Sequence, residues 1–226
     1  MTLRSRGLPR GGRFAWVLLL LIATGCAGQS RGGHHEHAFK DADRWARVFD
    51  DPARDAWQKP DEVVRALAPA PDAAVADIGA GTGYFAVRLA RAVPGGRVYG
   101  VDVEPDMVRY LAERARREGL ANLAAVQAAP ADARLPQPVD LVLVVNTYHH
   151  IGERPAYFDR LRRSLRPGGR VAIVDFLPDA PRGPPRHARI PAAVVKEEMG
   201  QAGYDLVTEH PFLPHQYFLV FSAASR

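Results

Sequence analysis

The stretch Asp77-Ile78-Gly79-Ala80-Gly81-Thr82-Gly83 follows the apolar run Val75 to Ile78 and leads into the helix-like stretch Tyr84 to Ala90. This order predicts a strand, a glycine turn and a helix, in which backbone amides at a helix N-terminus approach a ligand closely. Glycines at alternate positions permit backbone angles and approach distances that a side chain would block. We therefore expect the turn to bind a ligand through its backbone.

The spacing of the turn separates it from the dinucleotide fingerprint G-x-G-x-x-G. Its third glycine comes one residue early, and Tyr84 stands where that fingerprint has glycine. A second acid, Asp102, ends the predicted strand Arg97 to Asp102, 19 residues after Gly83. A carboxylate at the tip of a second strand accepts hydrogen bonds from ribose hydroxyls. We therefore expect Asp102 to bind a ribose, the alternative being an ordinary acid at a strand end.

Charge argues against nucleic acid as a partner. The chain has 226 residues and a formal net charge of +5, but Arg4, Arg6, Arg10 and Arg13 lie in its first 25 residues, which contain no acid. Without those four arginines, 26 basic residues face 25 acidic ones, so the remainder is near neutral. A nucleic-acid-binding surface would require a basic excess.

The first 25 residues have the pattern of a secretory signal. The arginines precede the apolar run Phe14 to Ile22, which is too short to span a bilayer comfortably. Ala23-Thr24-Gly25 then leads to Cys26, the only cysteine. This resembles a bacterial lipobox, although Ala23 replaces the more usual Leu. We expect lipidation at Cys26 and a position in the cell envelope. The alternatives are cleavage without lipid, an uncleaved anchor, a spurious upstream start, or a cytoplasmic protein with an unprocessed leader.

Residues 26–40 read as a flexible tether, and residues 41–226 as one domain. His34, His35, Glu36 and His37 in the tether are of the types that bind transition metals, but we favour a solvated polar linker and expect no metal site. Helical and strand patterns alternate through the domain, which predicts a mostly parallel sheet covered on both faces.

Several motifs together resemble class I S-adenosylmethionine-dependent methyltransferases. The run from Asp77 to Gly83 is similar to their first motif, D-x-G-x-G-x-G. Leu165 is expected to be the last apolar residue of a helix. The turn from Leu165 to Gly169 is similar to the turn before their fifth strand. The resemblance extends over roughly residues 57–222. It implies a Rossmann-like, seven-stranded α/β fold with an antiparallel last strand.

The resemblance also implies a cofactor, S-adenosylmethionine, and a set of residues that bind it. Asp132 corresponds to the acid that contacts adenine, with a surface acid as the alternative. Asn146 lies in the segment after the fourth strand, between cofactor and acceptor, and is expected to bind through hydrogen bonds. The expected cofactor-binding residues are Asp77, Gly79, Gly81, Gly83, Asp102, Asp132 and Asn146.

The segment after the fourth predicted strand supplies the candidate catalytic residues Tyr148, His149 and His150. Ligands of open α/β sheets bind at the carboxyl ends of strands, and a neutral histidine accepts a proton from an acceptor that must lose one. Paired histidines can instead only shape the cleft by hydrogen bonding.

Three functions remain open from the sequence. The leading one is a methyltransferase acting on a small-molecule, lipid or protein acceptor. The second is an envelope-tethered protein that binds a nucleoside-like ligand without turnover. The third, a nicotinamide-dependent oxidoreductase, is disfavoured by the glycine spacing.

Overall fold

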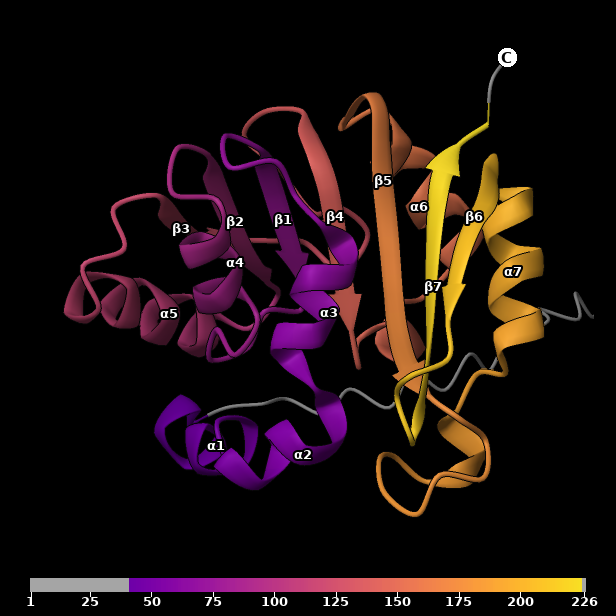
Figure 1. The fold of residues 1–226 in the computed structure, drawn as a ribbon, viewed down its shortest axis with the longest axis horizontal. Coiled ribbons are helices and arrows are strands. Elements are labelled where there is room, and N and C mark those ends of the chain that lie inside the picture. Colours follow the sequence, from indigo (N-terminus) through magenta and orange to yellow (C-terminus); the bar gives the residue numbers. More distant parts are fainter. Residues whose placement is uncertain (1–40, 225–226) are drawn as a thin grey trace, which may run out of the picture. The chain divides into compact units, whose positions relative to one another are not determined.

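The computed structural model describes residues 41–224. A single sheet has the strand order β3-β2-β1-β4-β5-β7-β6 (Figure 1). The strands are β1 (Ala74–Ile78), β2 (Arg97–Asp102), β3 (Leu123–Gln127), β4 (Val139–Val145), β5 (Leu165–Phe176), β6 (Tyr204–His210) and β7 (Gln216–Ala223). β7 runs antiparallel to its neighbours β5 and β6. The pairs β1–β2, β1–β4, β2–β3 and β4–β5 are parallel. The expected Rossmann-like, seven-stranded fold is confirmed.

Helices precede the first strand and connect several of the later ones. They are α1 (Ala42–Phe49), α2 (Asp55–Gln58), α3 (Pro60–Leu67), α4 (Ala86–Ala92), α5 (Pro105–Arg117), α6 (Arg154–Arg162) and α7 (Ala192–Gln201), with 3₁₀ turns η1 (Pro52–Arg54), η2 (Tyr148–His150) and η3 (Arg186–Ala188). Proline is tolerated in the first turn of α5, and Gly119 follows the helix at a φ of 67°.

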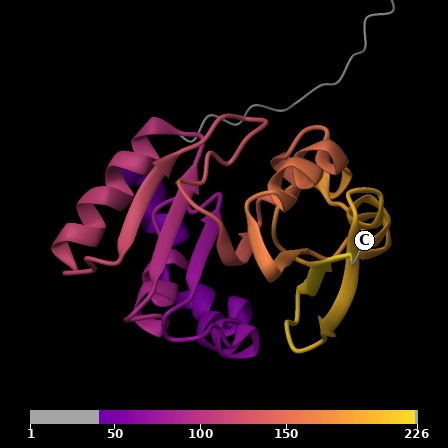
Figure 2. The ribbon, with the colours of Figure 1, turned by 90° about the horizontal axis from the view of Figure 1, so that it is seen from above.

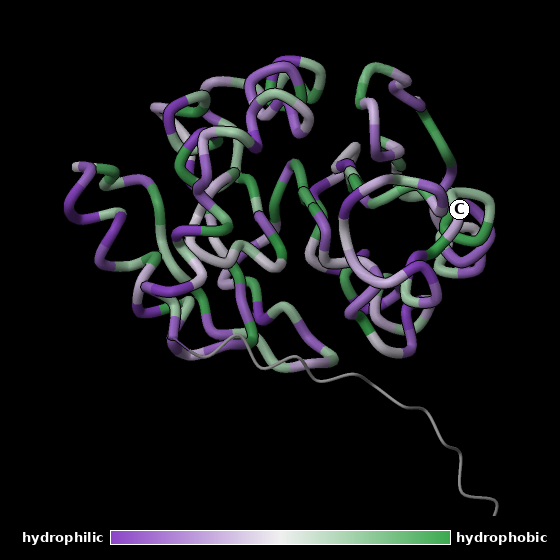
Figure 3. The backbone as a smooth tube through the Cα atoms, turned by 90° about the horizontal axis from the view of Figure 1, so that it is seen from below, coloured by the Kyte–Doolittle hydropathy of each residue, from purple (hydrophilic) through white to green (hydrophobic). Residues whose placement is uncertain are grey.

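Each face of the sheet has its own hydrophobic core. Side chains of α3, α4 and α5 pack on one face, and those of α6 and α7 pack on the other. β4 is buried along nearly its whole length, as a central parallel strand should be. In Figure 2 the earlier part of the described chain and the later part occupy opposite ends of the sheet, and Figure 3 shows hydrophobic and hydrophilic stretches alternating along the backbone.

The start of β5 differs from the sequence expectation. Leu165 was expected on the apolar face of the preceding helix, but it begins β5 and pairs with Val139 of β4. The pairing register shifts before Arg170, so a bulge contains the expected Pro-Gly-Gly turn. The physical reason is that a short apolar run beside a turn satisfies either a helix or a strand pattern, and pairing with β4 decides.

The amino-terminal helices lie at the edge of the sheet where a ligand would bind. In Figure 1, β1, β4 and β5 point down toward the edge at which α1 and α2 lie. Asp50, the C-cap of α1, pairs with Arg114 of α5 at 2.8 Å. The segment 42–58 therefore packs beside the carboxyl ends of the parallel strands.

Candidate functional site

The glycine turn joins β1 to α4, and the chain's own side chains explain two of its three glycines. A Cβ atom added at Gly79 would stand 2.1 Å from Oγ1 of Thr147, and one at Gly83 would stand 2.4 Å from Cδ1 of Leu111. Gly81, at a φ of 53°, has only the Phe49 ring nearby, at 3.3 Å. Gly79 and Gly83 thus permit close packing of the turn, while the space beside Gly81 is bounded by Phe49 of α1.

Asp77, at the end of β1, is a buried carboxylate whose hydrogen bonds are incomplete. Its side chain is 3% exposed, and its Oδ2 atom has no hydrogen-bond partner among the described residues. Burial raises the pKa of Asp77 to about 7, and repulsion from Asp102 adds to the rise, whereas Arg54 and the Ala86 amide oppose it. The orphaned oxygen is an acceptor position for a polar or cationic ligand group.

Asp102, at the end of β2, holds the glycine turn in place. Its two carboxylate oxygens accept backbone hydrogen bonds, one from Gly81 at 2.8 Å and the other from Glu104 at 2.9 Å. Burial raises its pKa, and the amides of Glu104, Gly81 and Val103 work against the rise. Because each carboxylate oxygen has two lone pairs, each retains one acceptor site. The geometry therefore suits a pair of ribose hydroxyls.

Asp132 is placed differently from the other two acids. It is exposed in the loop between β3 and β4, and its Oδ1 atom accepts the Arg134 amide at 2.9 Å. Ala129 and Asp132 form an isolated bridge that closes this loop. The carboxylate is available at the surface, and its contact with adenine stays a prediction.

Asn146, directly after β4, is half-buried and belongs to a cluster of three amides whose other members, Gln58 and Gln216, are buried. Its side chain donates to Gln58 at 3.2 Å and accepts from Gln216 at 2.5 Å, and Gln58 donates to Gln216 at 2.6 Å. Asn146 itself has a left-handed backbone, with a φ of 54°. The cluster ties α2, the end of β4 and the start of β7 together.

His149 and Asp175 form a hydrogen-bonded pair at the adjacent strand ends. Nδ1 of His149 lies 2.9 Å from Oδ2 of Asp175, and the two side chains are 5% and 3% exposed. Backbone amides of Phe176 and His149 also donate to the carboxylate. The His150 ring lies 4.1 Å from the His149 ring and is exposed. A carboxylate bound at Nδ1 fixes that proton, leaving Nε2 as the acceptor.

Tyr148 faces away from this pair, into the core. Its hydroxyl donates to Glu198 of α7 at 2.6 Å, and Arg154 binds the same carboxylate at 2.7 Å. Burial raises the pKa of Tyr148, and its hydrogen bond to Glu198 adds to the rise. A phenol that donates to a carboxylate in the core is placed to anchor η2 against α6 and α7.

Four polar side chains of this region were not among the sequence candidates: Arg54, Gln58, Asp175 and Gln216. Asp175 did have a local signal, because it follows the apolar residues of β5 at the same edge as Asp77 and Asp102. The others had none, since their partners lie in distant segments.

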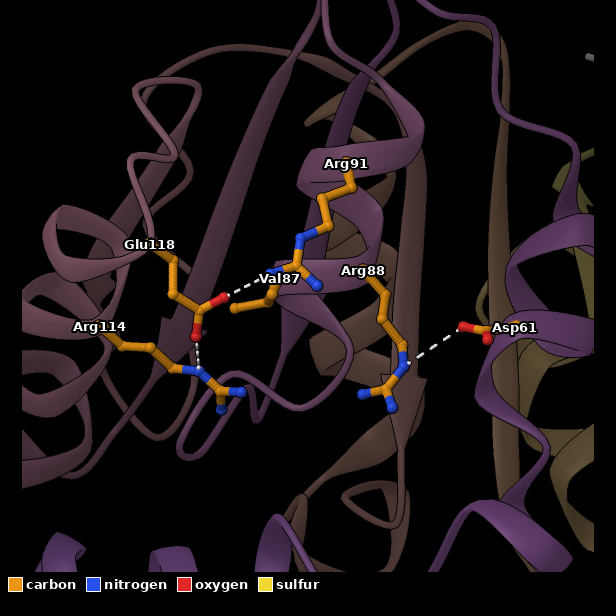
Figure 4. Close-up of a pocket in the computed structure, with 6 residues that line it drawn as sticks. All are labelled: Asp61, Val87, Arg88, Arg91, Arg114 and Glu118. Atoms are coloured by element: carbon orange, nitrogen blue, oxygen red, sulfur yellow. Dashed lines mark hydrogen bonds and ion pairs between the residues drawn. The ribbon is translucent and has the colours of Figure 1, made fainter. Parts of the chain in front are cut away.

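An open hollow of about 640 Å³ lies elsewhere, between α3, α4 and α5 (Figure 4). Its three arginines all pair with acids: Arg88 with Asp61 at 3.4 Å, Arg91 with Glu118 at 2.7 Å, and Arg114 with Glu118 at 2.8 Å. It is not formed by the strand ends, so it is separate from the residues described above.

Two further observations concern only residues 41–224. No helix there combines the length and apolar character needed to cross a membrane. No group of three or more His, Cys, Asp or Glu side chains there is placed to bind a metal ion. Cys26 and the tract from His34 to His37 lie outside the described residues.

The strand order, the glycine turn, the acid at the end of β2 and the polar residues after β4 together define the class I methyltransferase fold. Comparison with known proteins agrees. Residues 75–169 match the family described as "Methyltransferase domain". This match contains the glycine turn, Asp102 and the candidate catalytic residues.

Among curated proteins, the chain is similar to protein-L-isoaspartate O-methyltransferase of Aeropyrum pernix, with 34% identity over 121 residues, 52% of this chain. That alignment spans 44% of the relative's length. Among solved structures, a SAM-dependent methyltransferase from Aquifex aeolicus has a TM-score of 0.73 at 24% identity, covering 80% of this chain and 97% of that one.

Magnesium protoporphyrin IX methyltransferase from Synechocystis with bound SAH has a TM-score of 0.62 at 21% identity, covering 80% of this chain and 93% of that one. These matches support an S-adenosylmethionine-dependent methyltransferase with an unspecified acceptor. S-adenosylmethionine, the cofactor expected from the sequence, is confirmed as the cofactor of this class of methyltransferases.

Proposed function

We propose that this protein transfers a methyl group from S-adenosylmethionine to an acceptor that loses a proton, and that His149 is the base. The cofactor supplies an already activated methyl group, so the protein's part is to bind, orient and exclude water. The hydrogen bond from His149 to Asp175 carries the proposal, because it orients an imidazole at the carboxyl edge of the sheet.

The cofactor-binding residues fit a nucleoside with a charged end. Asp102 retains one acceptor site on each oxygen for the ribose hydroxyls. A Cβ at Gly81 would meet only the Phe49 ring, so this glycine leaves space beside the turn. The free Oδ2 of Asp77 suits a cationic group. In this proposal Asn146 positions the segment after β4, and Asp132 contacts the adenine.

In the proposed reaction, Nε2 of His149 accepts the proton of the acceptor while Asp175 holds the proton on Nδ1 and stabilises the charged imidazolium. A hydroxyl or other group that carries a proton at neutral pH, on a small molecule, a lipid or a protein, meets this requirement. In this proposal Tyr148 anchors η2, and His150 borders the acceptor-binding region beside His149.

Methyl transfer from labelled S-adenosylmethionine into a panel of hydroxyl, carboxyl and amine acceptors tests the proposal. With an accepted substrate, His149→Gln should lower kcat about 10²- to 10⁴-fold and change cofactor affinity less than about twofold, while His210→Gln controls for loss of an imidazole elsewhere. Cofactor binding without transfer to any acceptor would favour the non-catalytic alternative. A larger kcat loss from His150→Gln than from His149→Gln would reassign the base.

We also propose that the mature protein is anchored in the cell envelope through lipid on Cys26. The four arginines, the apolar run from Phe14 to Ile22 and the small residues before Cys26 support this. Two or more acyl chains hold a protein at a bilayer, where one chain gives only marginal binding.

A further inference from the structure

Arg54 differs from the arginines around it in having no acid in contact. Its Nη1 donates to the Phe49 carbonyl at 2.7 Å, and its Nε donates to the Gln58 amide oxygen at 3.1 Å. Among the described residues, no carboxylate lies within ion-pairing distance of it. Both acceptors are neutral, so the charge of this guanidinium is not compensated by direct contact.

The neighbouring arginine makes the contrast clear. Arg54 and Arg88 lie over the same Tyr84 ring, 4.0 Å and 4.3 Å from its centroid. Arg88 pairs with Asp55 at 3.2 Å and with Asp61 (Figure 4), whereas Arg54 pairs with neither. The same aromatic platform therefore carries one cation that is neutralised by acids and one that is not.

The position of Arg54 relates this charge to the cofactor-binding residues. Tyr84 directly follows Gly83, and Phe49, whose carbonyl binds Arg54, covers Gly81. Burial lowers the pKa of Arg54, while Tyr84, Asp50 and Asp77 act in the opposite direction, the two acids without an ion pair. Holding a desolvated guanidinium without a carboxylate costs free energy, which an anionic ligand group would recover.

The anionic group in question follows from the proposed function, on which this inference rests. The methionine end of S-adenosylmethionine carries a carboxylate and an ammonium group. A planar guanidinium binds carboxylates through paired hydrogen bonds, and Asp77 offers an unpartnered oxygen to a cation. We propose that Arg54 binds the cofactor's carboxylate, so that segment 42–58, which lies outside the matched residues 75–169, completes the cofactor site.

Calorimetry with two ligands, in the absence of any acceptor, tests this assignment. S-adenosylmethionine and decarboxylated S-adenosylmethionine share the nucleoside, the sulfonium and the ammonium, and differ only in the carboxylate. The parent protein should bind the first at least about tenfold more tightly. Arg54→Gln should lose this preference by weakening only the complete cofactor. Arg88→Gln, the matched control, should keep the preference.

Other results with Arg54→Gln would contradict the assignment. Equal weakening of both ligands by Arg54→Gln would make the residue purely structural and overturn the inference, as would a parent that binds both ligands equally. If circular dichroism shows that Arg54→Gln is unfolded, Arg54→Lys is measured instead. Lysine keeps the positive charge but lacks the planar guanidinium that makes paired hydrogen bonds to a carboxylate. The preference of Arg54→Lys should fall at least about threefold, and an unchanged preference overturns the inference. A folded parent that binds neither ligand refutes the proposed function as well.

Discussion

Replacing Asp102 with asparagine tests the cofactor site at its most constrained carboxylate. Asp102 is 9% exposed, and each of its oxygens accepts one backbone N–H, from Gly81 and from Glu104. Asparagine offers one oxygen and one NH₂ group, so one of these amides must face another donor. The substitution also removes the charged acceptor that we assign to the ribose.

Two effects of different size follow for Asp102→Asn. Loss of one hydrogen bond at the glycine turn should lower the free energy of unfolding by about 1 kcal/mol. Loss of the charged acceptor should weaken binding by roughly 1.5–3 kcal/mol, which corresponds to about 10- to 150-fold in Kd. Binding should therefore suffer more than folding.

Titration calorimetry with S-adenosylhomocysteine measures the loss in binding, and urea unfolding measures the loss in the free energy of unfolding. Asp106→Asn makes the same chemical change nearby, in a side chain that is 45% exposed, and should change Kd less than about twofold. A folded Asp102→Asn protein whose Kd matches that of the parent would refute the reasoning, because another group would then have to bind the ribose.

Three further predictions concern single positions. Gly81→Val, at a φ of 53° and with Phe49 at 3.3 Å from an added Cβ, should weaken cofactor binding at least about tenfold in calorimetry, and unchanged affinity in a folded variant would contradict it. Asp77 has a folded pKa of about 7 against an ordinary 3.8, so its stabilising contribution should be present below pH 4 and lost as pH rises toward 7. Relative to Asp77→Asn, the parent's free energy of unfolding should fall by up to about 4 kcal/mol over that range. Urea unfolding at pH 5, 6, 7 and 8 measures this difference for the two proteins, and a difference that stays constant with pH would argue against a raised pKa. Mass spectrometry of the amino-terminal peptide from the native host should show acyl chains on Cys26 as the first residue, whereas an intact Met1 terminus would rule out the lipid anchor.

The sequence alone determined those features that depend on neighbours along the chain. The apolar run before the glycine turn, the turn itself and the acid that ends the next predicted strand specify a strand-turn-helix-strand unit. The alternation of such units predicted the parallel sheet and the edge at which Asp77, Asp102, Asn146 and His149 meet. Local periodicity was sufficient because parallel strands place all their carboxyl ends at one edge.

Only the tertiary structure decided which side chains at that edge touch. His149 and Asp175 are 26 residues apart, and Gln58 and Gln216 are 158 residues apart, and no local pattern connects either pair. The tertiary structure likewise placed Asp132 on the surface, turned Tyr148 into the core and left Arg54 without an acid. Sequence periodicity tells which edge a residue reaches, whereas its partner depends on strand order, register and the packing of helices across the sheet.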